Sequence, residues 1–211
     1  MINSIFNQIE KPFGRDTAAA IGLAAIHLGR KNPREIMVVL PADHYISGVS
    51  RFKEVLKSAM NASMRGEEII TLGITPDRPE TGYGYIERGF LHDTFAGITA
   101  HRAARFLEKP DYTRALEILS SGNHLWNSGM FIWRVDLIKK LIEKHIPELV
   151  KGLGEIEEAL GGDHYEGVLE QVYSRLPRVS IDYGIMEKED NVLVMPGDFG
   201  WDDIGSWAMQ F

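Results

Sequence analysis

Residues 36–44, Ile-Met-Val-Val-Leu-Pro-Ala-Asp-His, decide the fold class of this chain. The apolar run from Ile36 to Leu40 is typical of a strand that is covered on both faces, as in a parallel sheet. Pro41 ends the run, so Asp43 follows the carboxyl end of the predicted strand. Ligands of open α/β sheets gather beyond the carboxyl ends of the strands, and this segment therefore predicts both a sheet and the edge at which it binds.

Helical and extended patterns alternate on both sides of this strand. A strongly helix-forming stretch from Thr17 to Leu28 precedes it, and apolar residues recur at helical spacing between Val49 and Ser63 after it. Such alternation predicts an open α/β sheet with right-handed crossovers. Further strands are expected at 68–74, 103–107, 130–133 and 191–195, helices at 112–119, 135–145, 147–160 and 165–173, and loop or irregular strand at 75–101.

Composition limits the classes of function. The chain has 211 residues with 23 Lys and Arg against 30 Asp and Glu, a formal charge of −7, which disfavours broad adhesion to nucleic acid or to an anionic membrane. The absence of cysteine excludes thiolate zinc sites and cysteine nucleophiles. The apolar run from Ala18 to Ile26 is too short to span a bilayer. We therefore expect a cytoplasmic protein that meets phosphate ligands through local cations or a metal.

No P-loop, HExxH helix or GxSxG turn is present, so the candidates are short polar motifs at the ends of predicted strands. Asp43 could cap the following turn or, together with Asp202 or Asp203, hold one Mg²⁺, a cation that prefers carboxylates, water and phosphate oxygens. Asn127 could satisfy backbone groups or read sugar hydroxyls with its amide. For each of these residues the sequence alone leaves the structural and the functional interpretation open.

Two further motifs are equally ambiguous. Thr81-Gly82-Tyr83-Gly84-Tyr85 is either a plain tight turn or a place where backbone N–H groups approach a ligand. Lys109 follows Glu108 at a strand end, which by itself indicates a solvated ion pair.

In their order along the chain, these motifs strongly resemble the mannose-1-phosphate guanylyltransferases, a branch of the sugar nucleotidyltransferases. The resemblance covers nearly the whole chain and rests on seven motifs, namely 10–20 (EKPFGRDTAAA), 40–44 (LPADH), 79–86 (PETGYGYI), 106–111 (FLEKPD), 126–131 (WNSGMF), 180–188 (SIDYGIMEK) and 200–207 (GWDDIGSW).

The resemblance implies a single catalytic domain over residues 1–211 with the nucleotidyltransferase fold, a Rossmann-like, mixed and mostly parallel sheet flanked by helices. It also implies a reaction in which mannose 1-phosphate attacks the α-phosphorus of GTP, so that GDP-mannose and pyrophosphate form. Such a protein needs to form no covalent bond with its substrates. It must align two anions and neutralise charge on the α-phosphate. A metal ion, here Mg²⁺, serves both needs.

The implied roles come from matching positions. Asp43 and Asp203 correspond to the two Mg²⁺ carboxylates, and Lys109, with Lys188 as a weaker candidate, to contacts with the sugar phosphate. Gly84, Glu108 and Asn127 correspond to the sugar site. The nucleotide pocket corresponds to Arg15, Thr17, Pro41 and Ala42, with Thr17 as the preferred base contact.

The chain departs from the family at its start, where members carry a strand and a glycine-rich loop that hold the triphosphate. We therefore expect an N-terminally incomplete domain, either a fragment of a longer protein or a reduced relative that cannot turn over alone. The alternatives are a catalytically silent sugar-nucleotide-binding or regulatory module, favoured by the missing loop, and a pyrophosphorylase for another sugar nucleotide. Homo-oligomerisation is left open by the sequence.

Overall fold

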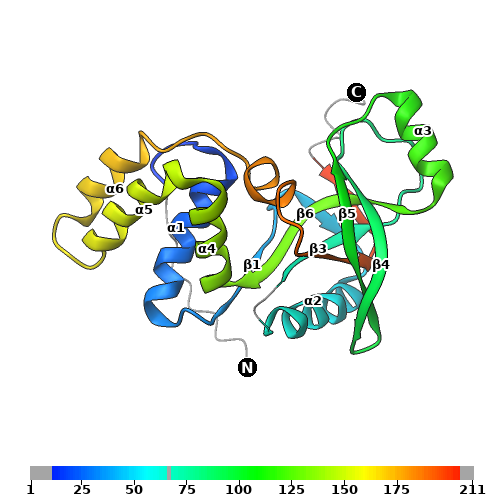
Figure 1. Cartoon of the computed structure of the whole chain (residues 1–211), viewed down its shortest axis with the longest axis horizontal. Helices are drawn as coiled ribbons and strands as arrows, with labels where there is room; N and C mark the ends of the chain where they lie inside the picture. The colour runs from blue at the N-terminus through cyan, green and yellow to red at the C-terminus, as the bar shows by residue number, and fades with distance from the viewer. Residues whose placement is uncertain (1–10, 66–67, 205–211) are drawn as a thin grey trace.

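A six-stranded sheet forms the centre of the protein, whose computed structural model describes residues 11–65 and 68–204. The strand order is β1-β6-β3-β7-β5-β4, and β4 also pairs with β6. Figure 1 shows the long β4–β5 hairpin standing at one side of the molecule. The strands are β1 (Ile36–Val39), β3 (Ile69–Ile74), β4 (Tyr85–Phe95), β5 (Ile98–Leu107), β6 (His124–Arg134) and β7 (Val192–Gly197).

The mixed sheet flanked by helices is confirmed, but its strands are not mostly parallel. Among the described strands only β3 and β7 pair in parallel, whereas β6 runs antiparallel to β1, β3 and β4, and β5 antiparallel to β4 and β7. β1 therefore pairs in antiparallel fashion, contrary to the prediction from Ile36 to Leu40. An apolar run carries no information on strand direction, which explains the difference. The expected cover on both faces is also absent, because β1 is an edge strand in which only Met37 is buried, and Leu40 is exposed.

Helices cover both faces of the sheet, as Figure 1 shows. Four helices form a layer on one side, and α2 (Val49–Ser63) covers the other. The helix predictions are confirmed, and α2 and α4 begin and end at the expected residues. The four helices are α1 (Asp16–Lys31), α4 (Val135–His145), α5 (Pro147–Ala159) and α6 (Tyr165–Tyr173).

Two apolar clusters stabilise these layers. One lies between the sheet and the four-helix layer and includes Trp133 of β6, and the other lies between the sheet and α2 and includes Ile70 and Leu72 of β3. All six residues of β3 are buried, as a central strand covered on both faces requires. The sheet is thus the common wall of both clusters.

The stretch 75–101, expected to be loop or irregular strand, contains most of the β4–β5 hairpin. Its turn is formed by Ala96 and Gly97, both with positive φ, at 48° and 83°. Residues with positive φ suit the twist of a two-residue hairpin turn. Register shifts between Glu87 and Asp93 interrupt the pairing, and such irregularities erase the period-two pattern by which a strand is recognised in sequence.

Four short elements complete the fold. β2 (His44–Ile46) pairs antiparallel with β8 (Trp201–Asp203), which brings the segment after β1 beside the C-terminal end of the described chain. α3 (Tyr112–Ser121) begins at the cap Asp111, whose side chain accepts from the backbone N–H of Arg114, and ends at Gly122 with φ 67°. A π-helical turn, η1 (Asp182–Met186), follows the four-helix layer.

In the described part of the chain, none of the helices combines the length and the apolar character that crossing a membrane requires. The assignment of residues 1–211 to one domain stays a prediction.

Candidate active site

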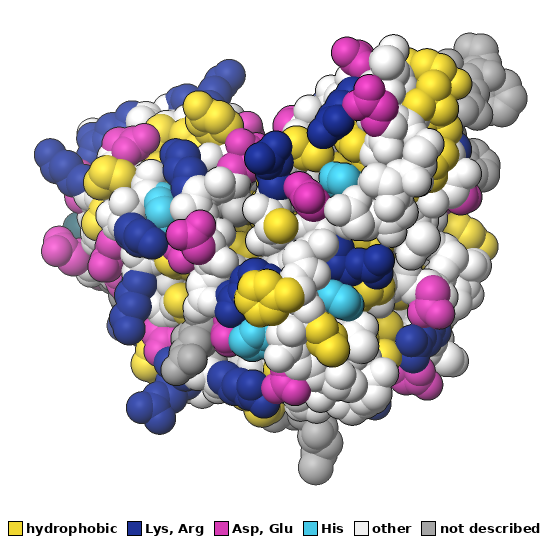
Figure 2. Space-filling view, turned by 45° about the vertical axis from the view of Figure 1, so that its right-hand side comes forward, with side chains coloured by type: hydrophobic (Ala, Val, Ile, Leu, Met, Phe, Trp, Pro, Cys, Tyr) yellow, Lys and Arg dark blue, Asp and Glu magenta, His cyan; other side chains and the backbone are white. Residues whose placement is uncertain are grey.

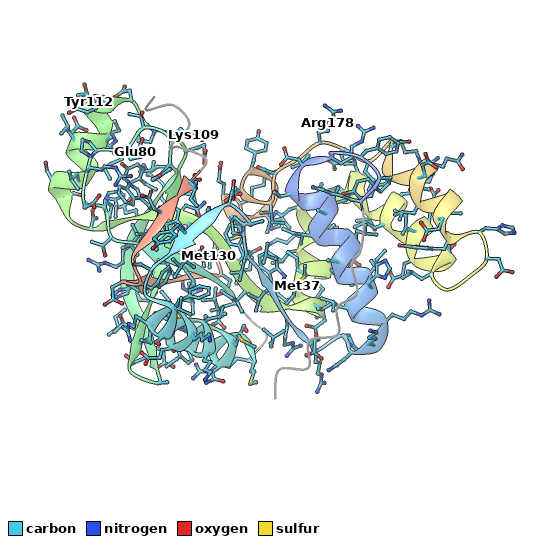
Figure 3. The ribbon with its side chains drawn as sticks, turned by 180° about the vertical axis from the view of Figure 1, so that it is seen from behind. Met37, Glu80, Lys109, Tyr112, Met130 and Arg178 are labelled. Carbon is cyan, nitrogen blue, oxygen red and sulfur yellow. The ribbon has the colours of Figure 1, made fainter. Side chains whose placement is uncertain are left out.

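A cleft of about 680 Å³ lies between the start of α1, η1 and the β2–β8 ribbon. Figure 2 shows a notch in the surface at the top of the molecule. In Figure 3, Lys109 lies near α3 and β8, and Arg178, which precedes η1 in the chain, lies across the molecule on the side of α1. The cleft is lined by Asp16, Thr17, Pro41, His44, Gly82, Tyr83, Gly84, Glu108, Lys109, Asn127, Ser128, Gly129, Ser180, Asp182, Tyr183, Glu187, Trp201 and Asp203. Seven of the eleven predicted site residues are in this set.

The three predicted sugar-site residues are in mutual contact. The backbone N–H of Asn127 donates to the carbonyl oxygen of Gly84 over 2.8 Å. A Cβ atom on Gly84 would lie 3.1 Å from Oε2 of Glu108 and 3.6 Å from Cβ of Asn127. β4, β5 and β6 thus bring a glycine, a carboxylate and an amide to one wall of the cleft.

Lys109 lies beside this wall. Its Nζ is 3.8 Å from Oε1 of Glu108, and its side chain is 64% exposed, so the cation can meet an anionic ligand at little cost. The backbone of Lys109 has φ 36°, a region that non-glycine residues rarely adopt. Asp16, on the facing wall, has φ 65°. Strained backbone of this kind concentrates at ligand sites.

Two carboxylates of the cleft are shifted toward the neutral form. Burial raises the pKa of Glu108, and the negative charges of Asp182 and Glu187 add to the effect while Lys109 opposes it. Burial also raises the pKa of Asp182, against a hydrogen bond from Asn127. Perturbed carboxylates in a cleft are typical of functional sites.

Of the two predicted metal ligands, Asp203 belongs to β8 and Asp43 directly precedes β2. His44 lies opposite Asp203 in the pairing register, and the N–H of Ile204 donates to the carbonyl oxygen of Asp43 over 3.2 Å. Asp203 lines the cleft, whereas Asp43 is exposed and is not among the lining residues. Residues 160 positions apart are therefore neighbours in the structure.

His44 is a cleft residue to which the sequence assigned no role. Its Nδ1 accepts from Nε1 of Trp201 over 3.0 Å, so a neutral ring carries its proton on Nε2. Burial lowers the pKa of His44, and the charges of Asp203 and Asp43 act in the opposite direction. The ring thus lies within the field of both carboxylates, and its burial disfavours the charged form.

The predicted nucleotide-pocket residues divide into two groups. Thr17 and Pro41 line the cleft, and Oγ1 of Thr17 accepts from the N–H of Ile181 over 2.7 Å. Ala42 is exposed outside the lining. Nε of Arg15 is buried without a hydrogen-bond partner among the described residues, and its charge acts on the buried phenol of Tyr173 in α6. Arg15 is therefore directed toward the helical layer.

Lys188 lies just outside the cleft. Its Nζ is 5.3 Å from the ring centre of Tyr183, a cleft residue, in a cation–π contact.

Asp182 lines the cleft but was not among the predicted site residues, although it lies within the motif 180–188. The sequence feature that could have identified it is an acidic residue within this motif, between Ser180 and Tyr183. A single carboxylate, however, does not by itself predict a functional site. The contact that distinguishes Asp182 is a hydrogen bond from Asn127, 55 residues away. π-helical turns, such as the one that begins at Asp182, frequently occur at functional sites.

Comparisons with known proteins show which family the chain is similar to. A model of the nucleotidyl transferase family matches residues 4–209. A mannose-1-phosphate guanylyltransferase of Escherichia coli K12 is 38% identical over 205 residues, which cover 96% of this chain and 43% of that protein. One from Sinorhizobium fredii NGR234 is 38% identical over 202 residues, covering 93% of this chain and 38% of that protein.

A solved structure is similar over the same range. The crystal structure described as mannose-1-phosphate geranyltransferase from Thermus thermophilus has a TM-score of 0.79 at 38% identity, covering 93% of this chain and 54% of that one. The chain thus spans about half the length, or less, of the relatives it matches. The match to the family model and the shared fold together show that the chain belongs to the nucleotidyl transferase family.

Proposed function

We propose that the protein transfers a guanylyl group from GTP to mannose 1-phosphate, giving GDP-mannose and pyrophosphate. The observation that supports this most directly is the meeting of Glu108, Lys109 and Asn127 with Asp203 around one cleft. A sugar 1-phosphate needs hydroxyl partners and a cation beside its phosphate, and the cleft offers both within one wall. The names of the relatives supply the base and the sugar.

The reaction forms one bond and breaks one. A phosphate oxygen of mannose 1-phosphate attacks the α-phosphorus of GTP, the bond from that phosphorus to the bridging oxygen breaks, and pyrophosphate leaves with the electron pair. Glu108 and Asn127 would hold the sugar hydroxyls while Lys109 contacts the attacking phosphate. Alignment of the two reactants supplies much of the rate enhancement in such a transfer.

Asp43 and Asp203 would hold Mg²⁺, which supplies neutralisation of charge on the reacting phosphates when it is bound. Asp203 of β8 and Asp43, which directly precedes β2, offer hard oxygen donors, as Mg²⁺ prefers. No group of three or more His, Cys, Asp or Glu side chains suited to a metal occurs among residues 11–65 and 68–204. The remaining positions of a bound Mg²⁺ would belong to water and substrate phosphate oxygens. The cytoplasmic location remains a prediction, and the oligomeric state stays open.

A substrate panel tests the proposal. Pyrophosphate release by the full-length protein would be measured with GTP, UTP or dTTP against mannose or glucose 1-phosphate, in Mg²⁺ and in EDTA. We expect release with GTP and mannose 1-phosphate that depends on Mg²⁺. Release from a different pair would contradict the substrate assignment, and binding without release from any pair would support a silent module.

Variants of the aspartates test the mechanism. Asp43→Asn and Asp203→Asn should each lower kcat about 100-fold or more, since they remove charge stabilisation at the reacting phosphate. Asp202→Asn is the matched control, because Asp202 lies next to Asp203 and faces Arg78 at 3.9 Å. It should retain activity, and melting temperatures should show that all three variants fold. Normal rates for both Asp43→Asn and Asp203→Asn would refute the metal-carboxylate mechanism.

A further inference from the structure

The side-chain amide of Asn127 is held at both of its ends. Its Nδ2 donates to Oδ1 of Asp182 over 2.8 Å, and its Oδ1 accepts from the N–H of Gly129 over 3.1 Å. A carboxylate such as Asp182 can only accept and a backbone N–H can only donate, so these partners specify which end of the amide is oxygen. One N–H and one oxygen lone pair of Asn127 remain for a ligand in the cleft.

Asp182 is itself fixed by the surrounding fold. It is the first residue of η1, and the preceding residue, Ile181, donates its N–H to Oγ1 of Thr17 over 2.7 Å. A Cβ atom on Gly184 would lie 2.6 Å from Cδ1 of Ile146, so the turn is packed closely against the end of α4. A carboxylate on such a rigid turn can fix the orientation of a neighbouring amide.

We infer that Asp182 is a positioning residue for the sugar, acting through Asn127. This inference rests on the proposed function and assigns the orientation of the sugar-reading amide to a carboxylate that lies 55 residues further along the chain. With the carboxylate present, the amide offers a hexose hydroxyl a fixed donor and acceptor. Without it, the amide rotates between orientations, and in some of them the donor and acceptor positions are exchanged.

A carboxylate suits this task better than an amide would. An amide at position 182 could present either its oxygen or its NH₂ group to Asn127, whereas both oxygens of a carboxylate accept. Burial raises the pKa of Asp182, and the hydrogen bond from Asn127 acts against that shift. Asp16 opposes the ionised form and Lys109 favours it. The bond that orients the amide thus favours the ionised form of Asp182, in which both oxygens accept.

Steady-state kinetics with both substrates tests the inference. Asp182→Ala should raise KM for mannose 1-phosphate about tenfold, as expected for one hydrogen bond, and leave KM for GTP within about twofold. The same substitution in an Asn127→Ala background should have no further effect on KM for the sugar phosphate. Asp182→Asn should be nearer to the wild type than Asp182→Ala, because its amide oxygen can still accept from Asn127.

Asp190→Ala is the matched control, since it removes a carboxylate a few residues further on, outside the cleft, and should leave both KM values unchanged. Independent effects of Asp182→Ala and Asn127→Ala would overturn the inference, as would an unchanged KM for the sugar phosphate or equal impairment by Asp182→Asn and Asp182→Ala. If Asp182→Ala does not melt cooperatively, Asp182→Asn with and without Asn127→Ala provides the same comparison.

Failure of the proposed function would be distinguishable. If the wild type forms no product from GTP and mannose 1-phosphate, the proposed function fails but the inference does not. Calorimetric titration with mannose 1-phosphate would still measure whether Asp182 affects sugar-phosphate binding through Asn127. An absence of heat in the wild-type titration would overturn the inference as well.

Discussion

Gly84 has no Cβ atom, and this leaves room for its neighbours in the wall of the cleft that we propose binds the sugar. A Cβ atom there would lie 3.1 Å from Oε2 of Glu108, closer than ordinary van der Waals contact. The Glu108 side chain is 53% exposed, so it can move away from an added Cβ atom. The absence of a Cβ atom at Gly84 therefore matters more for the position of the Glu108 carboxylate than for the stability of the protein.

We therefore expect Gly84→Ala to raise KM for mannose 1-phosphate several-fold while costing less than about 1 kcal/mol of unfolding free energy, the range for a small side chain whose neighbour can yield. Gly82→Ala is the comparison, because its Cβ atom would lie 3.5 Å from Oε1 of Glu80, an ordinary contact. Kinetics and urea unfolding of both variants would measure the difference. Equal KM values for Gly84→Ala and the wild type would contradict this role of the glycine.

Asp182 also predicts a pH dependence of stability. Its pKa is raised above the ordinary value of 3.8 in the folded protein, mainly by burial. The folded state therefore holds this proton more tightly than the unfolded chain, and the stabilisation present below the ordinary pKa is lost as pH rises through the folded value. Asp182→Asn removes that loss.

Asp182→Asn should therefore gain stability relative to the wild type as pH rises from about 4 to about 7. Asp136→Asn should show the opposite trend. A hydrogen bond from Arg134 lowers the pKa of Asp136, so its stabilisation is present above the ordinary pKa and is lost on acidification. Urea unfolding at several pH values would measure both, and parallel trends would refute the assigned signs.

At the scale of elements, the β2–β8 ribbon determines where Asp203 lies. The ribbon is only three residue pairs long, and beyond its end the N–H of Ser47 donates to the carbonyl oxygen of Gly200 over 3.0 Å. Gly200 has φ 62°, and a Cβ atom there would collide with Oγ of Ser47. A side chain at position 200 thus meets both backbone strain and a clash.

Gly200→Ala should destabilise the protein by about 1–3 kcal/mol and reduce kcat, because the ribbon that carries Asp203 is displaced. Gly122→Ala separates the two causes. Gly122 has a similar φ of 67° at the end of α3, but nothing lies within 4 Å of the position of its Cβ atom. It should cost about 1 kcal/mol with normal kcat. Normal kcat for Gly200→Ala would show that the turn does not position Asp203.

At the scale of the whole molecule, charge sets the conditions for binding. The chain carries a formal charge of −7, and the described lining of the cleft contains Asp16, Glu108, Asp182, Glu187 and Asp203 against the single cation of Lys109. Anionic substrates thus approach an acidic cleft in an acidic protein, and their negative charge needs a counter-charge.

GTP should therefore raise the melting temperature in the presence of Mg²⁺ and have little effect in EDTA. Added salt in EDTA should not weaken binding further, because screening reduces the repulsion between the cleft carboxylates and the triphosphate. Thermal melts over a range of GTP and salt concentrations would measure both effects. Equal stabilisation by GTP with and without Mg²⁺ would contradict a role for the cation.

The sequence by itself determined the local elements and, through its motifs, most of the cleft. Helices such as α2 and α4 followed from apolar spacing, since helix formation depends on residues three and four apart. The motifs for Gly84, Glu108 and Asn127 singled out residues that line the cleft, and their role in binding a sugar stays a prediction. These features depend on short-range patterns or on a resemblance that spans the chain.

Only the tertiary structure decided the direction of the strands, the β4–β5 hairpin and the contact between Asn127 and Asp182. Strand direction and register arise from pairings between distant segments. Register shifts in the β4–β5 hairpin interrupt the alternation of polar and apolar residues from which its strands could have been predicted. The Asn127–Asp182 bond joins residues 55 positions apart. No local pattern encodes such a meeting, because it exists only once the sheet and η1 have packed together.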